Sequence, residues 1–562
     1  IAVTALVVWG LTHQGGSSTA ASEDVIRSTL LLPEDRPLVM APGGSLDLSS
    51  DGSTLTYIAE QDGEEVLAVY NLSDGSVRTF SETAGATNPR FSPDDRSIAF
   101  VLEGGIHVVQ VDGGRPDFVA EASTVAGMSW LEDGFIYWSD QSGRWISRAS
   151  PNSESEILEN TRGCNCALPT RGPTEDGLTV SIRAREAAIY YPPSDSGITL
   201  PIEGNHVTYL PSGHVVYTRI GALYASSYDP ESGRISDDAR IILDNVTTSS
   251  ILRSAHYAVS DRGTLVYVAG EPHGLLEVVI RHPDGREEPV GMPVGAYGQL
   301  HASPNDQYLL IYSYDRGGRY LIYDFVNRTT RVASTPDMIA SPRWSADSRA
   351  IMFGQAHGSR TRIVRSAIDS GAEDSLFSVV GLVSVSAVSP DGRLVAYRTR
   401  GDRAISSTFV HDLETDSSSK LAAPEGTFIY APSFSPDGAY VVYTVIGPAG
   451  FEIMSQEIGS ERVWKLSIDG GSEPHWLSSG DAIVYRKEET WLLVKVRREG
   501  DTITFAEPAP YFTGDYADVA GVEYAMLSGE RAVVLRPVNP DRTVRRVEVI
   551  TGFYRLLAET VN

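Results

Sequence analysis

The sequence predicts an all-β chain folded as two consecutive β-propellers, and three observations carry this prediction. A short phrase occurs twelve times: one or two apolar or aromatic residues, a turn like Ser-Pro-Asp-Gly, then an apolar-alternating stretch that usually ends in Tyr or Phe. Successive turns lie roughly 36 to 50 residues apart, most of them about 43, which is the spacing of four-stranded propeller blades. Between Leu46 and Ile550 no helical apolar period is sustained, so no long helix is expected there.

Each copy of the phrase predicts a tight turn between two strands. Pro presets the backbone at the second turn position, Asp can accept a hydrogen bond from the backbone ahead of it, and Gly tolerates a positive φ. The flanks alternate and are rich in β-branched and aromatic residues, as strands are. The clearest copies span residues 90–100, 388–397 and 434–443. Weaker copies are centred on Gly52, Gly134, Gly177, Gly213, Gly263, Asp306, Ser348, Gly480 and Gly529.

The number of copies determines how the strands are divided. Most units carry a second strand pair, which completes four strands per blade. Propellers close with about four to eight blades, so twelve copies require two rings. The simplest partition is six blades and six, with the break between the copies at 260–263 and 303–306; seven plus five is the alternative. The predicted organisation is a truncated transmembrane segment and linker at 1–22, a first propeller at 23–272 and a second propeller at 273–562.

Two segments are expected to close these rings. A strand near residues 28–33 would supply the outer edge of the sixth blade. Residues 276–281, with 288–290, would close the second ring against the twelfth copy. Interlocking of this kind hides sheet edges that would otherwise pair with other chains.

The composition limits the classes of partner. The net charge is −27, from 46 Lys and Arg against 73 Asp and Glu, and basic residues cluster only in short runs such as 542–546. Because nucleic acid binding needs a basic surface that releases counterions, nucleic acid is excluded as a partner. The acidity serves solubility in one interpretation and attracts a cationic partner in the other.

The N-terminal residues indicate a membrane context. Residues 1–11 are almost uninterruptedly apolar, and no Lys or Arg follows them before Arg27. The run is shorter than the about 20 residues that cross a bilayer, and it matches the second half of a truncated span. By the positive-inside rule, the propellers are expected to be extracytoplasmic, that is, periplasmic. A signal peptide without its basic start is the alternative and predicts the same compartment.

Motifs for catalysis are absent from the sequence. The 11 His residues show no metal-ligand spacing, and there is no Gly-x-Ser-x-Gly elbow, dinucleotide fingerprint, Walker loop or kinase triplet. We therefore expect no catalytic residue, no cofactor and no metal. Cys164 and Cys166, one residue apart, could form a small, strained disulfide loop or remain as two unpaired thiols, and without nearby His they cannot complete a tetrahedral metal site.

The residues that recur most often are predicted to be structural. The Asp of each turn is expected to hold the turn together rather than to ligate calcium. The aromatic residues that flank the turns are expected to form the core between blades; they are Trp130, Tyr137, Tyr267, Trp344, Phe434, Tyr443, Trp476 and Tyr485. Any binding site should then lie in the irregular loops and in the channel.

The repeats resemble a known family. The units at 91–96, 344–349 and 434–438 resemble the TolB-like, WD40-like repeats of bacterial periplasmic propellers. Residues 257–267 and 279–286 look like the midpoint of the double-propeller region that follows the membrane span of bacterial transmembrane serine/threonine kinases. Residues 549–557 are similar to the closing strand and short C-terminal helix of that region. The resemblance covers nearly all of the chain from Leu30 onward.

This resemblance implies the fold, a short C-terminal helix and a membrane-anchored setting, but it implies the kinase association only through domain pairing. Several copies depart from the pattern: those at 132–134, 211–213 and 528–530 lack the Ser-Pro start. Copies three to five are the most degenerate, so the blade count is less firmly predicted in the first ring than in the second.

Three functions are compatible with these observations. The first is a non-catalytic extracytoplasmic binding or sensor module of a membrane-anchored signalling protein of the serine/threonine kinase type, with a protein, peptide or small-molecule ligand at its loops or channel. The second is the substrate-gating propeller of a prolyl-oligopeptidase-type peptidase, whose hydrolase domain would lie elsewhere. The third is a TolB-like envelope scaffold that binds a protein partner.

Overall fold

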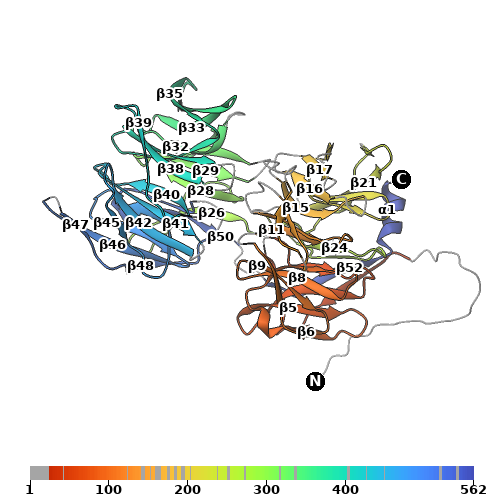
Figure 1. Cartoon of the computed structure of the whole chain (residues 1–562). Coiled ribbons are helices and arrows are strands. Elements are labelled where there is room, and N and C mark those ends of the chain that lie inside the picture. Colours follow the sequence, from red (N-terminus) through yellow and green to blue (C-terminus); the bar gives the residue numbers. More distant parts are fainter. Residues whose placement is uncertain are drawn as a thin grey trace, which may run out of the picture.

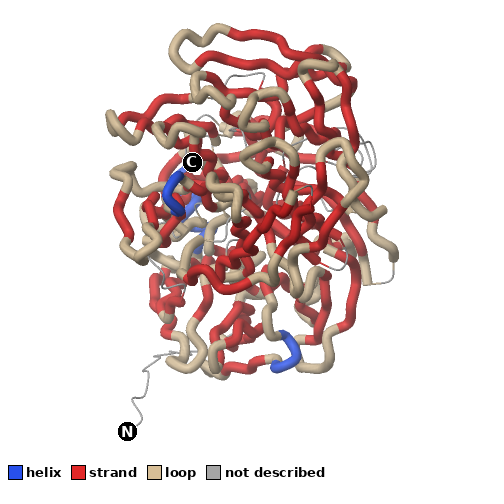
Figure 2. Tube along the Cα trace, turned by 90° about the vertical axis from the view of Figure 1, so that its left-hand side faces the viewer, coloured by secondary structure: helices blue, strands red, loops and turns tan. Residues whose placement is uncertain are grey.

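The computed structural model describes residues 24–561 with short internal gaps, and the described residues are almost entirely β. Twelve sheets are formed by these residues, and Figure 1 shows them gathered in two lobes. Strands run through the whole view of Figure 2, with only short helical pieces beside them. The predicted all-β fold of two propellers is confirmed. The gaps are residues 42, 123–124, 141–145, 152, 159–165, 174–177, 183–185, 191–196, 203, 220, 237, 250–253, 271–273, 315–317, 334–337, 401–405, 426, 448–449, 501, 518–521 and 539–542.

Six sheets form the first ring, and we number its blades by the order of their turns. The inner strands β3, β7, β11, β15, β19 and β24 surround one axis. The first blade contains β51 (Thr543–Val544), β2 (Leu38–Val39), β3 (Leu46–Leu48), β4 (Thr54–Gln61), β5 (Glu64–Asn71) and β6 (Val77–Thr79), and the second contains β7 (Thr87–Phe91), β8 (Ser97–Leu102), β9 (Gly105–Gln110) and β10 (Asp117–Glu121). The third blade contains β11 (Val125–Trp130), β12 (Ile136–Asp140), β13 (Ile146–Ala149) and β14 (Glu156–Ile157), and the fourth contains β15 (Cys166–Arg171), β16 (Leu178–Ile182), β17 (Glu186–Tyr190) and β18 (Gly197–Leu200). The fifth blade contains β19 (Asn205–Leu210), β20 (His214–Arg219), β21 (Ala222–Asp229), β22 (Arg234–Ile235) and β23 (Arg240–Leu243), and the sixth contains β24 (Tyr257–Val259), β25 (Leu265–Tyr267), β52 (Arg546–Thr551) and β1 (Ile26–Leu31).

The second ring repeats this plan, with β28, β32, β36, β40, β44 and β49 as its inner strands. The seventh blade contains β28 (Tyr297–Ala302), β29 (Tyr308–Ser313), β30 (Arg319–Asp324) and β31 (Thr329–Val332), and the eighth contains β32 (Met338–Trp344), β33 (Ala350–His357), β34 (Arg360–Ala367) and β35 (Glu373–Val380). The ninth blade contains β36 (Val383–Val388), β37 (Leu394–Arg400), β38 (Ser406–Asp412) and β39 (Ser417–Lys420), and the tenth contains β40 (Phe428–Phe434), β41 (Tyr440–Gly447), β42 (Gly450–Glu457) and β43 (Val463–Lys465). The eleventh blade contains β44 (Ser472–Trp476), β45 (Ala482–Lys487), β46 (Thr490–Glu499), β47 (Thr502–Phe505) and β48 (Ala509–Thr513), and the twelfth contains β49 (Tyr524–Met526), β50 (Ala532–Pro537), β26 (Leu276–Arg281) and β27 (Glu287–Pro289).

Contacts between the inner strands close both rings. In the first ring β3 contacts both β7 and β24, and in the second ring β28 contacts both β32 and β49. In each ring, a tyrosine hydroxyl of the last inner strand donates a hydrogen bond to a backbone carbonyl of the inner strand before it. Tyr257 of β24 donates to the carbonyl of His206 in β19, and Tyr524 of β49 donates to the carbonyl of Glu473 in β44.

The expected closing strands pair as the sequence predicts. The N-terminal β1 is the outer edge of the sixth blade, where it pairs with β52. Strand β26 pairs with β50 of the twelfth blade and with β27. Both pairings cover strand edges that would otherwise be open to other chains.

The C-terminal tail corrects the predicted domain limits. Residues 543–561 were assigned to the second propeller, but β51 pairs with β2, and β52 lies between β1 and β25 in the first ring. Helix α1 (Phe553–Val561) packs on β21 and β23, so the blue tail lies in the orange and yellow lobe of Figure 1. The second ring, from β26 to β50, is therefore inserted between two strands of the sixth blade. The remaining limits, 1–22, 23–272 and the start at 273, stay predictions.

The recurring Asp of the turn is a turn-forming residue, as predicted. Asp94 accepts hydrogen bonds from the Ser92 hydroxyl at 2.6 Å and from the Arg96 amide at 3.2 Å. The Ser92 oxygen in turn accepts the Ser97 amide at 2.9 Å. The same arrangement recurs at Ser345 and Asp347, at Ser389 and Asp391, and at Ser435 and Asp437. Ser and Asp are needed because these bonds hold the turn without any distant contact.

An acidic residue at the fourth turn position links neighbouring blades. Asp95 has a φ of 57° and accepts hydrogen bonds from the amide and hydroxyl of Ser50 in the preceding turn. Asp306, with a φ of 56°, holds the amide and hydroxyl of Ser528 in the same way. A left-handed backbone conformation costs more for Asp than for Gly, and these inter-blade bonds offset that cost.

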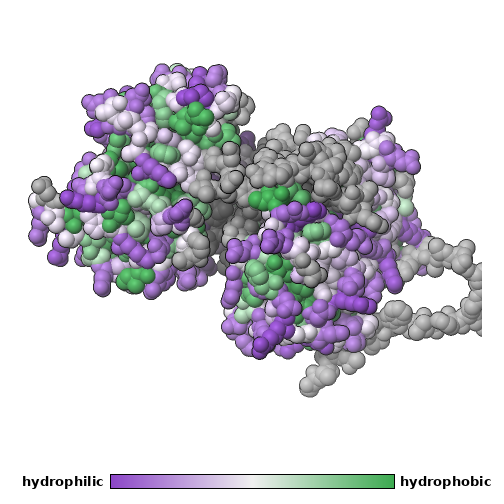
Figure 3. Space-filling model, viewed as in Figure 1, coloured by the Kyte–Doolittle hydropathy of each residue, from purple (hydrophilic) through white to green (hydrophobic). Residues whose placement is uncertain are grey.

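Polar residues cover most of the visible surface. Figure 3 shows hydrophilic residues over both lobes with small apolar patches between them. Inside, each blade packs its apolar side chains against the next, as in the cluster of Phe91, Phe100 and Val109 with Ile58 and Leu67. Within the described part of the chain, no helix is long and apolar enough to cross a membrane.

Candidate functional site

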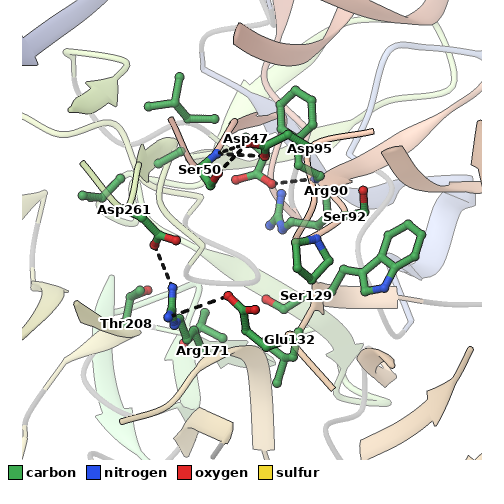
Figure 4. Close-up of a pocket in the computed structure, with 18 of the residues that line it drawn as sticks. Asp47, Ser50, Arg90, Ser92, Asp95, Ser129, Glu132, Arg171, Thr208 and Asp261 are labelled. Carbon is green, nitrogen blue, oxygen red and sulfur yellow. Dashed lines mark hydrogen bonds and ion pairs between the residues drawn. The ribbon is translucent and has the colours of Figure 1, made fainter. Parts of the chain in front are cut away.

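A cavity of about 190 Å³ opens at one end of the first ring's axis. All six inner strands of that ring contribute to it, together with the turns that follow them, so it is the mouth of the central channel (Figure 4). We call it the channel mouth. Its polar and aromatic lining residues include Asp47, Ser50, Arg90, Asp95, Ser129, Trp130, Glu132, Thr170, Arg171, His206, Thr208, Tyr257 and Asp261.

Arg90 is held in place by backbone carbonyls. Its Nε donates to the carbonyl of Met128 on the next blade at 2.7 Å, and Nη1 donates to those of Pro89 at 2.6 Å and Leu46 at 3.3 Å. Burial lowers the pKa of Arg90, and the nearby charge of Asp47 opposes that effect. The guanidinium thus joins three blades at the base of the mouth.

A bulge in β7 creates this position. The strand register shifts between Thr87 and Arg90, and Asn88 takes a φ of 54°. A bulge re-aims the side chains that follow it, which is why bulges are common beside binding sites. Register shifts in β11, β15 and β19 indicate that most inner strands of the ring share this device.

Asp47 supplies the deepest carboxylate of the channel mouth. Its Oδ2 accepts the Phe91 amide at 2.9 Å. Burial raises the pKa of Asp47, while the positive charge of Arg90 and the backbone hydrogen bonds lower it by less. The carboxylate therefore lies where an additional positive charge would be favourable.

His206 lines the cavity with a neutral, buried imidazole. The residue is 7% exposed and has a φ of 50°, and its Nδ1 accepts the Ala255 amide at 2.8 Å. Because Nδ1 accepts a hydrogen bond, the proton of the neutral ring resides on Nε2. Burial is the main cause that lowers the pKa of His206 to about 3, with a contribution from Arg90.

The rim is acidic and carries one arginine. Arg171 lies 2.7 Å from an oxygen of Asp261 and 3.9 Å from one of Glu132. Dashed lines mark both ion pairs in Figure 4. The side chains of Asp261 and Glu132 are 42% and 48% exposed. Both acids occupy the second position of a turn, which is Pro in the clearest copies of the repeat.

The hydroxyl that lines the cavity beside Trp130 is not arranged as a nucleophile. Ser129 donates its hydroxyl hydrogen bond to the carbonyl of Pro169 at 2.8 Å. A serine nucleophile instead needs a base within hydrogen-bond reach of its oxygen. Within the described residues, no group of three or more His, Cys, Asp and Glu side chains could hold a metal ion.

The cavity lies in the channel, one of the two places where the sequence predicts a binding site. The channel was an expected location, but only the recurring Asp and the flanking aromatics of the turns were assigned a role, and that role was structural. Glu132 and Asp261, at the second turn position, were not singled out, and they face the channel mouth. The available signal was the acid that replaces Pro in these degenerate copies. Trp130 packs against the core, as predicted, and also lines the cavity. Of the two cysteines, Cys164 lies outside the described residues and Cys166 begins β15, so the choice between a disulfide and two unpaired thiols stays untested.

Comparisons with known proteins find similar solved structures but no matching family model and no matching curated protein. Among solved structures, the chain is similar to a putative TolB from Agrobacterium tumefaciens, with 14% identity and a TM-score of 0.37 over 47% of this chain and 99% of the other. It is also similar to TolB from Acinetobacter baumannii, with 14% identity and a TM-score of 0.32 over 59% and 80% of the two chains.

A third similar structure is the tricorn protease, with 12% identity and a TM-score of 0.29 over 90% of this chain and 61% of the other. At such TM-scores these likenesses support no statement about what this chain binds or does. They leave the kinase-associated part of the resemblance untested.

Proposed function

We propose that this chain is a non-catalytic binding module whose ligand docks at the channel mouth of the first ring. The observation that carries the proposal is the cavity itself, an open axial site lined by charged side chains that fixed backbone bonds hold in place. A preorganised site of this kind binds without first having to order its own residues.

The chemistry of the lining favours binding over catalysis. His206 uses Nδ1 to accept a backbone hydrogen bond, and Ser129 donates to a carbonyl rather than to a base. Asp47 is bonded to the Phe91 amide rather than to a nucleophile. These groups can orient a ligand, but they are not paired as acid, base and nucleophile.

Filling the cavity tests this function. Thermal unfolding would be followed with a library of peptides and glycans, because a ligand that binds the folded state raises the melting temperature. A compound that stabilises the wild type should fail to stabilise Ser129→Tyr, whose ring fills the channel mouth. The matched control is Ser153→Tyr on an exposed loop, which should keep the full shift. Equal shifts in both variants would exclude the channel mouth as the binding site.

We further propose an extracytoplasmic, membrane-anchored sensor that reports to a serine/threonine kinase-like domain. The apolar run at 1–11 and the kinase-associated resemblance of residues 257–286 and 549–557 support this setting. The coding sequence upstream of Ile1 provides the test. A membrane span preceded by a cytoplasmic domain is expected there, and a sequence that encodes neither would refute the signalling role.

A further inference from the structure

We infer that the channel mouth of the first ring binds the cationic end of a lysine or arginine side chain presented by a partner protein. This inference rests on the proposed function and names the chemistry of its ligand.

The charges that line the cavity are unbalanced. Four carboxylates face it, from Asp47, Asp95, Glu132 and Asp261, against the two guanidinium groups of Arg90 and Arg171. The neutral ring of His206 adds no positive charge to compensate. The excess of two negative charges lies in a concave site with protein walls, which focus the field on a positive ligand. The net charge of −27 on the whole chain acts in the same direction over longer distances.

Three of these carboxylates remain within reach of a ligand. Asp95 uses both oxygens to hold Ser50. By contrast, Glu132 is nearly half exposed and its closest approach to Arg171 is 3.9 Å, longer than a hydrogen bond. Asp261 is 42% exposed and holds Arg171 through Oδ1. A cation that enters the mouth would meet Glu132 and Asp261 first and Asp47 deeper inside.

Arg171 already shows what these acids bind. Its guanidinium lies between Asp261 and Glu132, in the position that a cationic ligand group would take or share. The pair is part-exposed, so water can reach it and it can rearrange at little cost. Arg171 is thus a stand-in within the chain for the ligand, and its removal should free acceptors rather than remove a ligand contact.

The cavity is sized for one side chain. Its volume of about 190 Å³ lies below the roughly 300 to 1,000 Å³ of pockets that enclose a whole small-molecule ligand. Trp130 and Tyr257 line it with aromatic surface, which suits both the methylene stem and the charged head of Lys or Arg. An open mouth of this size leaves the rest of the partner outside, on the turns.

Matched peptides test the sign of the charge. Fluorescein-labelled Gly- and Ser-based peptides that differ only in a central Lys, Arg, Gln or Glu would be titrated by polarisation at low and high salt. The Lys and Arg peptides should bind most tightly, and salt should weaken them most. A free diamine forms a separate arm, and binding of the diamine without any of the cationic peptides would assign the site to a small amine and overturn the inference.

Removing the positive charge of the rim and removing its negative charges should change the affinity for cationic peptides in opposite directions. Arg171→Gln should tighten the Lys and Arg peptides by about threefold to tenfold, while the double variant Glu132→Gln, Asp261→Asn should weaken them by a similar factor. The control double variant Asp117→Asn, Glu121→Gln makes the same charge change as the rim double variant at exposed positions of β10, away from the mouth, and should leave the affinity unchanged. Unchanged melting temperatures would show that all variants fold.

These experiments distinguish a failure of the cationic-ligand inference from a failure of the proposed binding function. Tighter binding of the Glu peptide, with Arg171→Gln weakening it, would overturn the cationic ligand but leave the channel mouth as a binding site. No binding by any peptide would overturn the inference alone. If, in addition, Ser129→Tyr and Ser153→Tyr respond alike to the library, the proposed function fails as well.

Discussion

The two rings share one axial scaffold but place their charges differently. Arg90 in the second blade of the first ring has a counterpart in Arg343 in the second blade of the second ring. Each donates Nε to a carbonyl of the next blade, at 2.7 Å and 2.8 Å, and Nη1 to the carbonyl of the preceding Pro. The backbone frame around the axis is therefore repeated, down to single hydrogen bonds.

The fifth blades show where the rings diverge. His206 and Glu473 both lie within a bulge, with φ values of 50° and 57°, and both carbonyls accept a tyrosine hydroxyl. The imidazole of His206 is neutral, while the Glu473 carboxylate accepts the Glu523 amide at 2.9 Å. The same backbone position thus carries different side-chain chemistry in the two rings.

The rims differ as well. At the second turn position the first ring carries Glu132 and Asp261, whereas the second ring carries only uncharged residues, namely Pro304, Ala346, Pro390, Pro436, Ser478 and Ser528. The second ring instead buries charge inside, as the ion pair of Arg486 and Glu523. The difference teaches that the scaffold is conserved within the chain while the accessible charge is set by a few turn and bulge residues.

The largest change in stability should come from removing the C-terminal tail, which completes the first ring but not the second. Ending the chain after Asp541 removes β51, β52 and α1, with the buried Val547, Val549, Ile550, Phe553 and Leu557. At about 1.5 to 3 kcal/mol for each side chain, the loss is roughly 8 to 15 kcal/mol, as large as the stability of a whole domain. Calorimetry should show the unfolding transition of the second ring alone. Retention of two transitions would mean that the first ring does not depend on the tail.

A buried and an exposed ion pair should respond very differently. Glu523→Gln leaves Arg486, 5% exposed, without its charge partner and should destabilise the second ring by about 3 to 5 kcal/mol. Asp261→Asn removes the partner of the part-exposed Arg171 and should cost the first ring no more than about 1 kcal/mol. Urea unfolding of both variants measures the difference, and similar costs would contradict the contrast between the rings.

Acid should weaken the first ring through His206. Its pKa is lowered to about 3 in the folded chain, against about 6.5 when unfolded, so the imidazole stays neutral in the fold. Below about pH 6.5 the unfolded chain gains a proton that the folded chain does not, and stability falls by up to about 2 kcal/mol by pH 5. His206→Gln should flatten that slope. Hydrogen exchange of the strands of the first ring, measured from pH 7 to 5, provides the readout; an unchanged slope would exclude this histidine.

The smallest effects should be equal in the two rings. Tyr257→Phe and Tyr524→Phe each remove a hydroxyl that bonds the neighbouring inner strand, at 2.7 Å and 2.6 Å. Each change should cost about 1 kcal/mol in the ring that carries it. Thermal unfolding of the two variants compares them directly. A large cost in only one ring would show that the shared scaffold is not energetically equivalent.

The repeat made the fold predictable because its information is local. Ser, Asp and Gly specify a turn through bonds within a few residues, as between Ser92 and Asp94, and the alternating flanks specify strands. The closing role of residues 276–281 was also predictable, since an unpaired strand had to cover the twelfth blade. The site was not predictable in this way, because Arg90, His206 and Asp261 come from three blades and no local pattern brings their side chains together.

The sequence by itself determined the number of blades, their turns and the all-β class, because each depends on neighbours along the chain. Only the tertiary structure decided that residues 546–551 leave the second ring and complete the sixth blade beside β1. It also decided that Asp47, Glu132 and Asp261 meet around one axis. Both outcomes depend on contacts between residues far apart in sequence, which ring closure creates and which no local pattern encodes.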